Sequence, residues 1–218
     1  MERPVRKESK LVFYTNKLGE LVLVDVMLLI ACIPVITVVP AFSAMHYVLL
    51  KILRDEETGV IKAFWKSFRE NLRQGVVLSI LYLALFAGQI AFFWCAYQKI
   101  IRFDALFLIA VAVLTFLTSV SFQWVCIMLS RYECTVIGAI RNAFRIAVGK
   151  PLTSLSVVFI SYAPFLGLLL LPRLLPMMLF LSFSVCGLLQ TMLYRKVFAI
   201  IEEKEETPAL QTESEEQI

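Results

Sequence analysis

One acidic side chain, Asp25, lies near the middle of the first long apolar stretch of the sequence, residues 18–33. An ionisable group inside a membrane segment is costly, and it commonly faces a polar cavity or a partner. The polar side chains that we expect near it follow on the next segment: Thr37, Ser43 and His46. These four residues form a candidate intramembrane polar site. The alternative is a packed, hydrogen-bonded or protonated acid that joins two helices.

These residue types do not complete a catalytic or metal-binding set. His46 is the only histidine, and no cysteine or carboxylate follows it at the spacing of metal ligands. Ser43 and His46 lack an orienting acid and an oxyanion hole, and an intramembrane enzyme would need Asp25 and His46 to meet in a water-accessible pocket. The five cysteines are scattered, with no Cys-x-x-Cys pair, and no phosphate-binding glycine motif is present. We therefore expect no catalytic residue, no metal and no cofactor, and a protein that is not an enzyme.

The composition places these residues in a membrane protein. The chain has 218 residues, of which 60% are apolar and 17% are charged, and its mean hydropathy is +0.80. Soluble domains have about a quarter of charged residues, and they need polar surface to stay in solution. Several apolar windows of about 20 residues match the hydrocarbon thickness of a bilayer. The expected fold class is all-α, a polytopic transmembrane helical bundle.

The number of membrane crossings depends on residues 18–50. A helix that starts at Leu18 is expected to end or kink at Pro34, and a helical pattern resumes at Ala41. One crossing needs only about 20 residues. Two crossings would both be short, or would form a re-entrant hairpin. The remaining spans are expected at residues 75–97, 103–129, 152–171 and 174–193.

The charge distribution favours six spans with both termini in the cytoplasm, because short cytoplasmic loops collect Lys and Arg. If residues 18–50 enter the membrane and return, 18 of the 21 Lys and Arg lie on one side. Only Lys99, Arg102 and Arg173 then lie on the other side. A re-entrant hairpin would leave the same sidedness.

Two basic amphipathic segments, residues 61–74 and 136–148, each lead into an apolar span. Apolar residues recur along one side of each segment and basic residues along the other, which is typical of helices in the membrane interface. Residues 60–69 align with residues 136–145, which indicates a parallel repeat of the kind that some transporters use. The sharper interpretation is a docking helix for a cytoplasmic partner such as a transporter subunit. The candidate docking or interfacial residues are Phe64, Trp65, Lys66, Phe68, Arg69, Arg141 and Arg145.

The two ends of the chain differ in charge. Residues 1–17 carry five Lys or Arg and are expected to form a basic cytoplasmic tail, ahead of a transmembrane domain over residues 18–201. Residues 202–218 carry seven Glu and one Lys without hydrophobic periodicity, which predicts an acidic, disordered tail. Topology already explains the basic residues at the membrane ends, so nucleic acid is not an expected partner. The expected partners are the lipid bilayer and, as one alternative, a transporter subunit, and the oligomeric state is open.

Three stretches of the sequence resemble a known family. They read IPVITVVPA over residues 33–41, AMHYVLLK over residues 44–51 and FWKSFREN over residues 64–71. In these stretches the chain is similar to the YesL-like family, small integral membrane proteins of bacteria built around a domain of unknown function. The resemblance implies a bacterial cytoplasmic membrane and, because the family often occurs beside carbohydrate uptake systems, a sugar-transport context. Family members commonly have Asn where this chain has Asp25, so the resemblance assigns no fixed role to that position.

The sequence is compatible with two functions. The first is a non-enzymatic multi-pass membrane protein that assists, or forms part of, a small-molecule transport system, with carbohydrate as the expected substrate class. The second is a structural or stress-related membrane scaffold without a substrate pathway. A wholly apolar bundle interior, with Asp25 sealed by its neighbours, would favour the scaffold.

Overall fold

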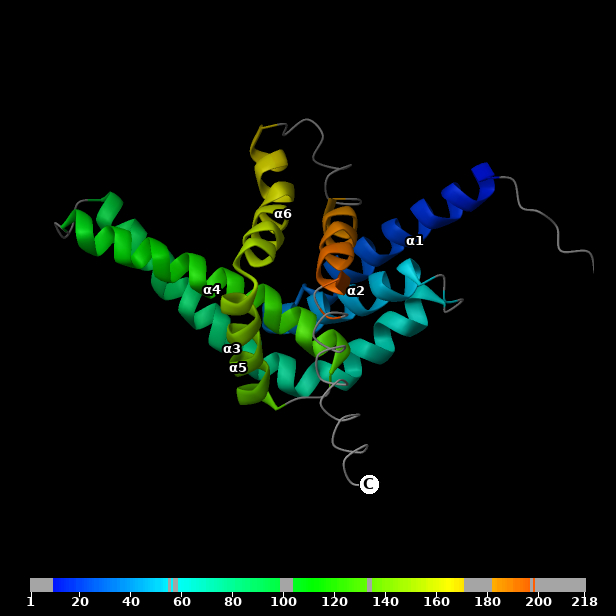
Figure 1. The fold of residues 1–218 in the computed structure, drawn as a ribbon, viewed down its shortest axis with the longest axis horizontal. Coiled ribbons are helices and arrows are strands. Elements are labelled where there is room, and N and C mark those ends of the chain that lie inside the picture. Colours follow the sequence, from blue (N-terminus) through cyan, green and yellow to red (C-terminus); the bar gives the residue numbers. More distant parts are fainter. Residues whose placement is uncertain are drawn as a thin grey trace, which may run out of the picture.

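A computed structural model describes residues 10–54, 56, 59–98, 104–132, 135–170, 182–196 and 198. These residues form helices joined by turns, without a β-strand among them, which confirms the predicted all-α class. The helices are α1 (Lys10–Ala31), α2 (Val38–Leu53), α3 (Val60–Tyr97), α4 (Ala105–Arg131), α5 (Val136–Gly149) and α6 (Pro151–Leu170). A further helical segment over residues 182–196, named the C-terminal helix below, completes the bundle (Figure 1).

The predicted bounds of the two tails compare differently with the structure. Helix α1 begins at Lys10, whereas the sequence predicts a tail through residue 17, because the short apolar run over residues 11–14 continues the helical pattern. The acidic tail over residues 202–218 lies outside the described residues, as do residues 174–181 of the predicted last span.

The chain turns back on itself between α1 and α2, as the sequence predicts. Pro34 lacks a backbone N–H and prevents a continuous helix, and one 3-10 turn, η1 (Val35–Thr37), leads into α2. The Thr37 hydroxyl lies 2.6 Å from the carbonyl oxygen of Ala31 and 2.5 Å from that of Pro34. The single hydroxyl proton can bond to one of the two at a time, and the bond to Ala31 satisfies a carbonyl group that the end of α1 would otherwise leave unpaired.

Helix α2 belongs to two hydrophobic cores. One core joins α1, α2 and the first half of α3, and it contains the buried α2 residues Ala44 and Val48. The other core joins the start of α2 and the second half of α3 with α4, α5, α6 and the end of the chain, around Trp124 and Tyr194. Helix α2 is therefore the central element of the bundle, as Figure 1 also shows.

Two glycines allow other helices to approach α2 closely. At Gly75 of α3, an added Cβ would lie 2.7 to 3.0 Å from the ring atoms of Pro40. At Gly187 of the C-terminal helix, it would lie 2.7 Å from Cδ1 of Leu49. Small residues at helix crossings permit this close packing inside membranes.

Helices α3 and α4 run side by side as a long hairpin (Figure 1), and many of its apolar side chains are exposed. Large side chains such as Trp94, Leu106 and Ile109 are exposed along the hairpin. An apolar surface of this extent is unusual on a soluble protein and normal in contact with lipid. The outside of the hairpin therefore has the character of a lipid-facing surface.

Three helices among the described residues are long and apolar enough to cross a membrane: Val35–Leu53, Val60–Tyr97 and Leu106–Arg131. The count becomes four if the bent pair α5 and α6 forms one broken span. Every 18-residue stretch of α1 contains Lys17, Glu20 and Asp25, whereas each of these three helices has a stretch of that length with at most two charged residues. The six-span topology stays a prediction.

The two amphipathic segments join their following spans in different ways. Residues 60–74 continue through Gly75 into the rest of α3 without a break. Helix α5 instead ends at Gly149, α6 begins at Pro151, and the two helices are bent by 109°. Gly75 and Pro151 occupy equivalent positions when the two segments are aligned. Proline favours the first turn of a new helix and disfavours a helical residue before it, so the second unit bends where the first does not.

Candidate functional site

Asp25 of α1 is completely buried and lies against the C-terminal helix. The Ser184 hydroxyl is 2.5 Å from its carboxylate Oδ1 and 2.9 Å from the carbonyl oxygen of Leu21. The backbone N–H groups of Phe183 and Ser184 also face the carboxylate. The Asp25–Ser184 pair links two segments that are 159 residues apart and explains how an acid is held among apolar side chains.

Within the described part of the chain, Asp25 makes no hydrogen bond to Thr37, Ser43 or His46, so the structure does not join the four residues in one hydrogen-bonded group. The Thr37 hydroxyl closes the turn after α1. Ser43 and His46 are fully buried on α2, and the His46 ring meets the Tyr194 ring edge to face at 5.8 Å between centroids. Sequence position places these residues near one another along the chain, but helix packing gives Asp25 a partner from the far end of the protein.

Asp25 and His46 do not form the water-accessible pocket that an intramembrane enzyme would need. Both side chains have no accessible surface. Asp25 accepts a hydrogen bond from Ser184, and the ring nitrogens of His46 have no hydrogen-bond partner among the residues that the structure describes. Proton transfer to a bound substrate requires contact within hydrogen-bond reach, and this arrangement offers no space for one.

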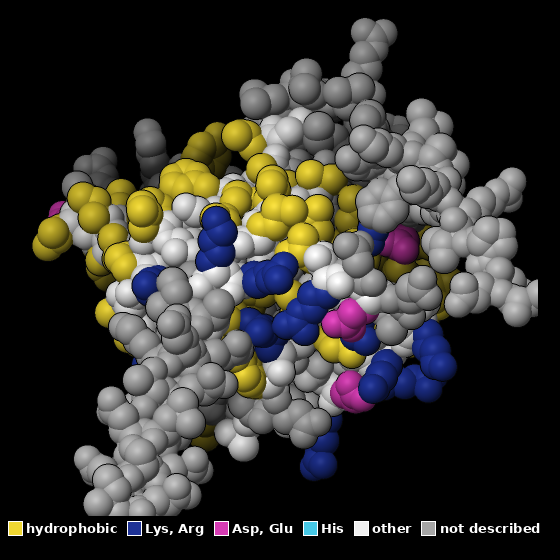
Figure 2. Space-filling model, turned by 45° about the vertical axis from the view of Figure 1, so that its right-hand side comes forward, with side chains coloured by type: hydrophobic (Ala, Val, Ile, Leu, Met, Phe, Trp, Pro, Cys, Tyr) yellow, Lys and Arg dark blue, Asp and Glu magenta, His cyan; other side chains and the backbone are white. Residues whose placement is uncertain are grey.

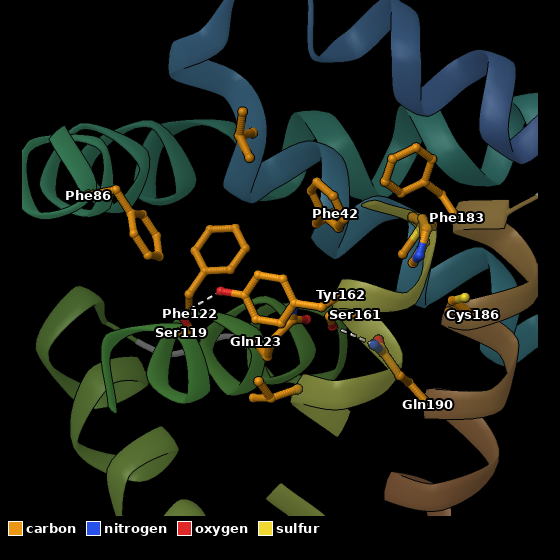
Figure 3. A pocket seen from close by; sticks show the side chains of 15 residues that line it. Phe42, Phe86, Ser119, Phe122, Gln123, Ser161, Tyr162, Phe183, Cys186 and Gln190 are labelled. Carbon is orange, nitrogen blue, oxygen red and sulfur yellow. Dashed lines mark hydrogen bonds between the residues drawn. The ribbon is translucent and has the colours of Figure 1, made fainter. Parts of the chain in front are cut away.

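A cavity of about 230 Å³ lies between α2, α3, α4, α6 and the C-terminal helix. Figure 3 shows aromatic rings around it, including Phe42 and Phe122. Its polar groups bond to one another: the Ser119 and Tyr162 hydroxyls are 2.9 Å apart, and the Gln190 amide donates to the Ser161 hydroxyl at 2.6 Å (Figure 3). The cavity is smaller than the 300–1,000 Å³ or so of typical ligand pockets. Its wall therefore offers mainly apolar contact.

A second cavity of about 400 Å³, named the polar cavity below, lies where α2, α3 and the end of α4 meet. The Asn71 amide donates to the Ser67 carbonyl oxygen at 3.1 Å. The Gln74 amide and the Tyr47 hydroxyl make no hydrogen bond within the described part of the chain. Both groups can donate and accept, so they can bind a polar solute. The lining residues are Tyr47, Ser67, Glu70, Asn71, Gln74, Leu129, Ser130, Arg131 and Tyr132.

The first half of α3 divides the candidate docking residues between two faces. Phe64 and Phe68 are buried against α1 and α2, with their rings stacked at 6.2 Å. Trp65, Lys66 and Arg69 are exposed. The buried pair holds this part of α3 on the bundle, and only the exposed three remain available to lipid or to a partner.

Helix α5 presents the other two candidate residues, Arg141 and Arg145, on its exposed side. Phe144 is exposed between them, while Ala139 and Ala143 are completely buried on the opposite side. A surface that mixes apolar and basic side chains suits the boundary between headgroups and acyl chains. The basic residues of α3 and α5 are thus accessible on helices that contact each other.

Sequence reasoning did not identify Ser184, Gln74 or Tyr47. A signal for Ser184 was present, because a hydroxyl in an apolar span needs a hydrogen-bond partner, but nothing local indicated which acid it would meet. Gln74 and Tyr47 lie inside α3 and α2, and nothing in the local sequence indicated that the two side chains would line one cavity. Over the described ranges, no group of three or more His, Cys, Asp or Glu could hold a metal ion.

The long apolar helices and their exposed apolar surfaces are those of a helical membrane protein. Residues 21–93 match the model of a family described as "Protein of unknown function, DUF624". The matched region runs from α1 into the last turns of α3, so it includes Asp25, the turn at Pro34 and the exposed residues of the first half of α3. Neither the curated proteins nor the solved structures contain a match to this chain.

Proposed function

We propose that the protein is a non-enzymatic, multi-pass component of a small-molecule transport system in the bacterial cytoplasmic membrane, with carbohydrate as the substrate class. The observation that carries the proposal is the polar cavity. At about 400 Å³ it is large enough for a small solute. Within the described part of the chain the Gln74 amide and the Tyr47 hydroxyl keep their full hydrogen-bonding capacity, so both can bind a solute that replaces water in the polar cavity.

The chemistry of the polar cavity supports a solute that is rich in hydroxyl groups. Carboxylate, amide, guanidinium and hydroxyl groups line it, and two tyrosine rings, those of Tyr47 and Tyr132, belong to the same wall. Such groups donate and accept in several directions, which suits a polyhydroxylated molecule better than an apolar one. The match to DUF624 is compatible with the YesL-like resemblance, and the sugar-transport context comes from that resemblance alone.

The exposed residues of α3 support a role beside a partner rather than as an energised pump. Lys66 and Arg69 project from the same half of α3 that lines the polar cavity. A partner that docks there would touch the helix that contacts the solute. In this proposal both termini and the basic residues face the cytoplasm, where the ATP-binding subunit of a transporter would lie.

A binding measurement tests the cavity directly. The purified protein is titrated with a panel of monosaccharides and disaccharides, and binding is followed by calorimetry. A Gln74→Leu variant should bind about three- to tenfold more weakly, as loss of one hydrogen bond of about 0.5–1.5 kcal/mol predicts. The matched control is Gln98→Leu at the exposed C-terminal end of α3, which should bind normally. Binding of no sugar by the intact protein would exclude the substrate class.

A second measurement tests the transport partner. The protein is isolated from its native membrane, and co-purifying ATP-binding subunits are identified by mass spectrometry. A Lys66→Glu, Arg69→Glu double variant should lose the partner, whereas Lys66→Arg, Arg69→Lys should retain it because the charges remain. The transport role is refuted if no transport component co-purifies with the protein and if sugar uptake is unchanged in a strain that lacks the gene.

The buried Asp25–Ser184 pair favours the second candidate, a membrane scaffold. Asp25 is sealed by its neighbours and joins α1 to the C-terminal helix, as a purely structural residue would. The bundle interior is not wholly apolar, however, because it also contains buried polar side chains such as Gln89 and Gln190. A scaffold would show normal solute uptake after deletion together with loss of a membrane assembly, so the same deletion strain distinguishes the two functions.

A further inference from the structure

We propose that the acidic segment over residues 202–218 lies on the basic face of the protein and covers it. The basic face is defined here by the exposed residues Lys62, Lys66, Arg69 and Arg73 of α3 and Arg141 and Arg145 of α5. The proposal concerns the occupant of this face and does not depend on the transport role or on which side of the membrane the face adopts.

The basic face carries charge that its surroundings leave uncompensated. Lys66 pairs with Glu70 at 4.0 Å. Over the described ranges, no acidic side chain pairs with Arg69, Arg141 or Arg145. Figure 2 shows Lys and Arg side chains gathered on one side of the molecule with only a few acidic side chains among them. A surface with this excess of one sign attracts an anionic partner.

The end of the described chain is anchored against α4. Phe198 is buried, with its ring centroid 6.2 Å from that of Trp124, and the guanidinium carbon of Arg131 lies 4.5 Å from the same centroid. Arg131 is also part of the polar cavity, whose other wall is the first half of α3. The acidic segment begins four residues after this anchored ring, so its start can lie at most about 14 Å from Phe198.

The acidic segment matches the basic face in charge and in length. It holds seven Glu and one Lys, against the six basic residues of the face. A flexible chain of 17 residues has a root-mean-square length of about 20–25 Å. Lys62 and Arg73 are about 16 Å apart along the helix axis at 1.5 Å per residue. The segment is therefore long enough to cover the α3 part of the face without being fully extended, and its attachment keeps its local concentration in about the millimolar range.

Covering the face has a consequence for binding. Anionic headgroups, or an acidic partner, must displace the segment before they can reach Arg69 or Arg141. Salt screens the attraction, since the Debye length falls from about 10 Å at 0.1 M to about 3 Å at 1 M ionic strength. The segment should accordingly leave the face in high salt.

Zero-length carbodiimide cross-linking of the full chain tests the proposal, because it joins a Lys amine to a carboxylate only when the two are in contact. One copy of the protein is placed in each nanodisc of neutral phosphatidylcholine, and cross-links are mapped by mass spectrometry. We expect links from Lys62 or Lys66 to glutamates of residues 202–216, with a yield that falls about fivefold between about 0.1 and 1 M NaCl. The Lys66–Glu70 pair is the internal positive control.

A charge reversal on the basic face separates attraction from chance contact. Arg69→Glu leaves both lysines in place for the chemistry and should lower the yield of tail links about threefold, since it replaces an attraction by a repulsion. Arg54→Glu makes the same change on α2, outside the basic face, and should leave the yield unchanged. Recovery of the Lys66–Glu70 link without any tail link overturns the proposal. Tail links whose yield changes neither with salt nor with Arg69→Glu also overturn the proposal. If the lysines of the basic face are shielded only in nanodiscs that contain anionic lipid, the occupant of the face is lipid headgroups and the proposal is wrong.

Discussion

Substitution of Gly75 by alanine should loosen the crossing of α2 and α3. This crossing positions the first half of α3, which carries the exposed basic residues and one wall of the polar cavity. The added Cβ of Gly75→Ala would meet three ring atoms of Pro40 at 2.7, 2.9 and 3.0 Å. The ring is rigid and belongs to the backbone of α2, so it cannot rotate away, and one of the two helices must shift.

The expected magnitude combines two opposing effects. Replacing a helical glycine by alanine stabilises a helix by about 0.5–1 kcal/mol. Forcing one extra carbon into a close-packed contact costs about 1–3 kcal/mol. The free energy of unfolding should therefore fall by up to about 2 kcal/mol in the Gly75→Ala variant. Gly88→Ala is the matched control on the same helix, because no atom lies within 4 Å of an added Cβ there.

Equilibrium unfolding in mixed micelles with increasing dodecyl sulfate measures both variants. Gly88→Ala should be as stable as the parent protein or slightly more stable, and Gly75→Ala should be less stable than Gly88→Ala by about 1–3 kcal/mol. The difference between the two variants removes the helix propensity, which they share. Equal stability of the two alanine variants would refute the close contact between α3 and Pro40.

Three further predictions use the same unfolding measurement. In a double-mutant cycle, Asp25→Ala and Ser184→Ala should couple by about 1–2 kcal/mol, because a hydrogen bond to a charged group is stronger than a neutral one; additivity within about 0.5 kcal/mol would show that the pair is not bonded. Gly187→Ala should cost less than Gly75→Ala, since the added Cβ meets the terminal methyl group of Leu49, which can rotate; an equal cost would contradict this. Pro151→Ala should lower the free energy of unfolding by about 0.4–1 kcal/mol through greater freedom of the unfolded chain, and a gain in stability would argue against a proline-set bend.

The helical class and the main turn could be predicted from local sequence because their causes are local. Apolar windows of bilayer length indicate membrane helices wherever they occur, and Pro34 ends a helix by its own geometry. The start of α1 was less predictable. The lysines at positions 10 and 17 are typical of a basic tail, and only the structure shows that the chain between them is helical. The amphipathic pattern of residues 61–74 was also correct as a pattern, but it did not show whether Phe64 and Phe68 face lipid or protein.

The sequence by itself determined that this chain is helical and apolar, that it turns at Pro34, and that its basic residues gather at helix ends. Only the tertiary structure decided that Asp25 meets Ser184, because the choice of partner depends on how α1 and the C-terminal helix pack across 159 residues. It also decided that equivalent positions in two similar segments differ, since Gly75 fits against Pro40 within a continuous helix while Pro151 starts a new one. Periodicity defines the faces of a helix, whereas shape complementarity between distant helices decides which faces meet.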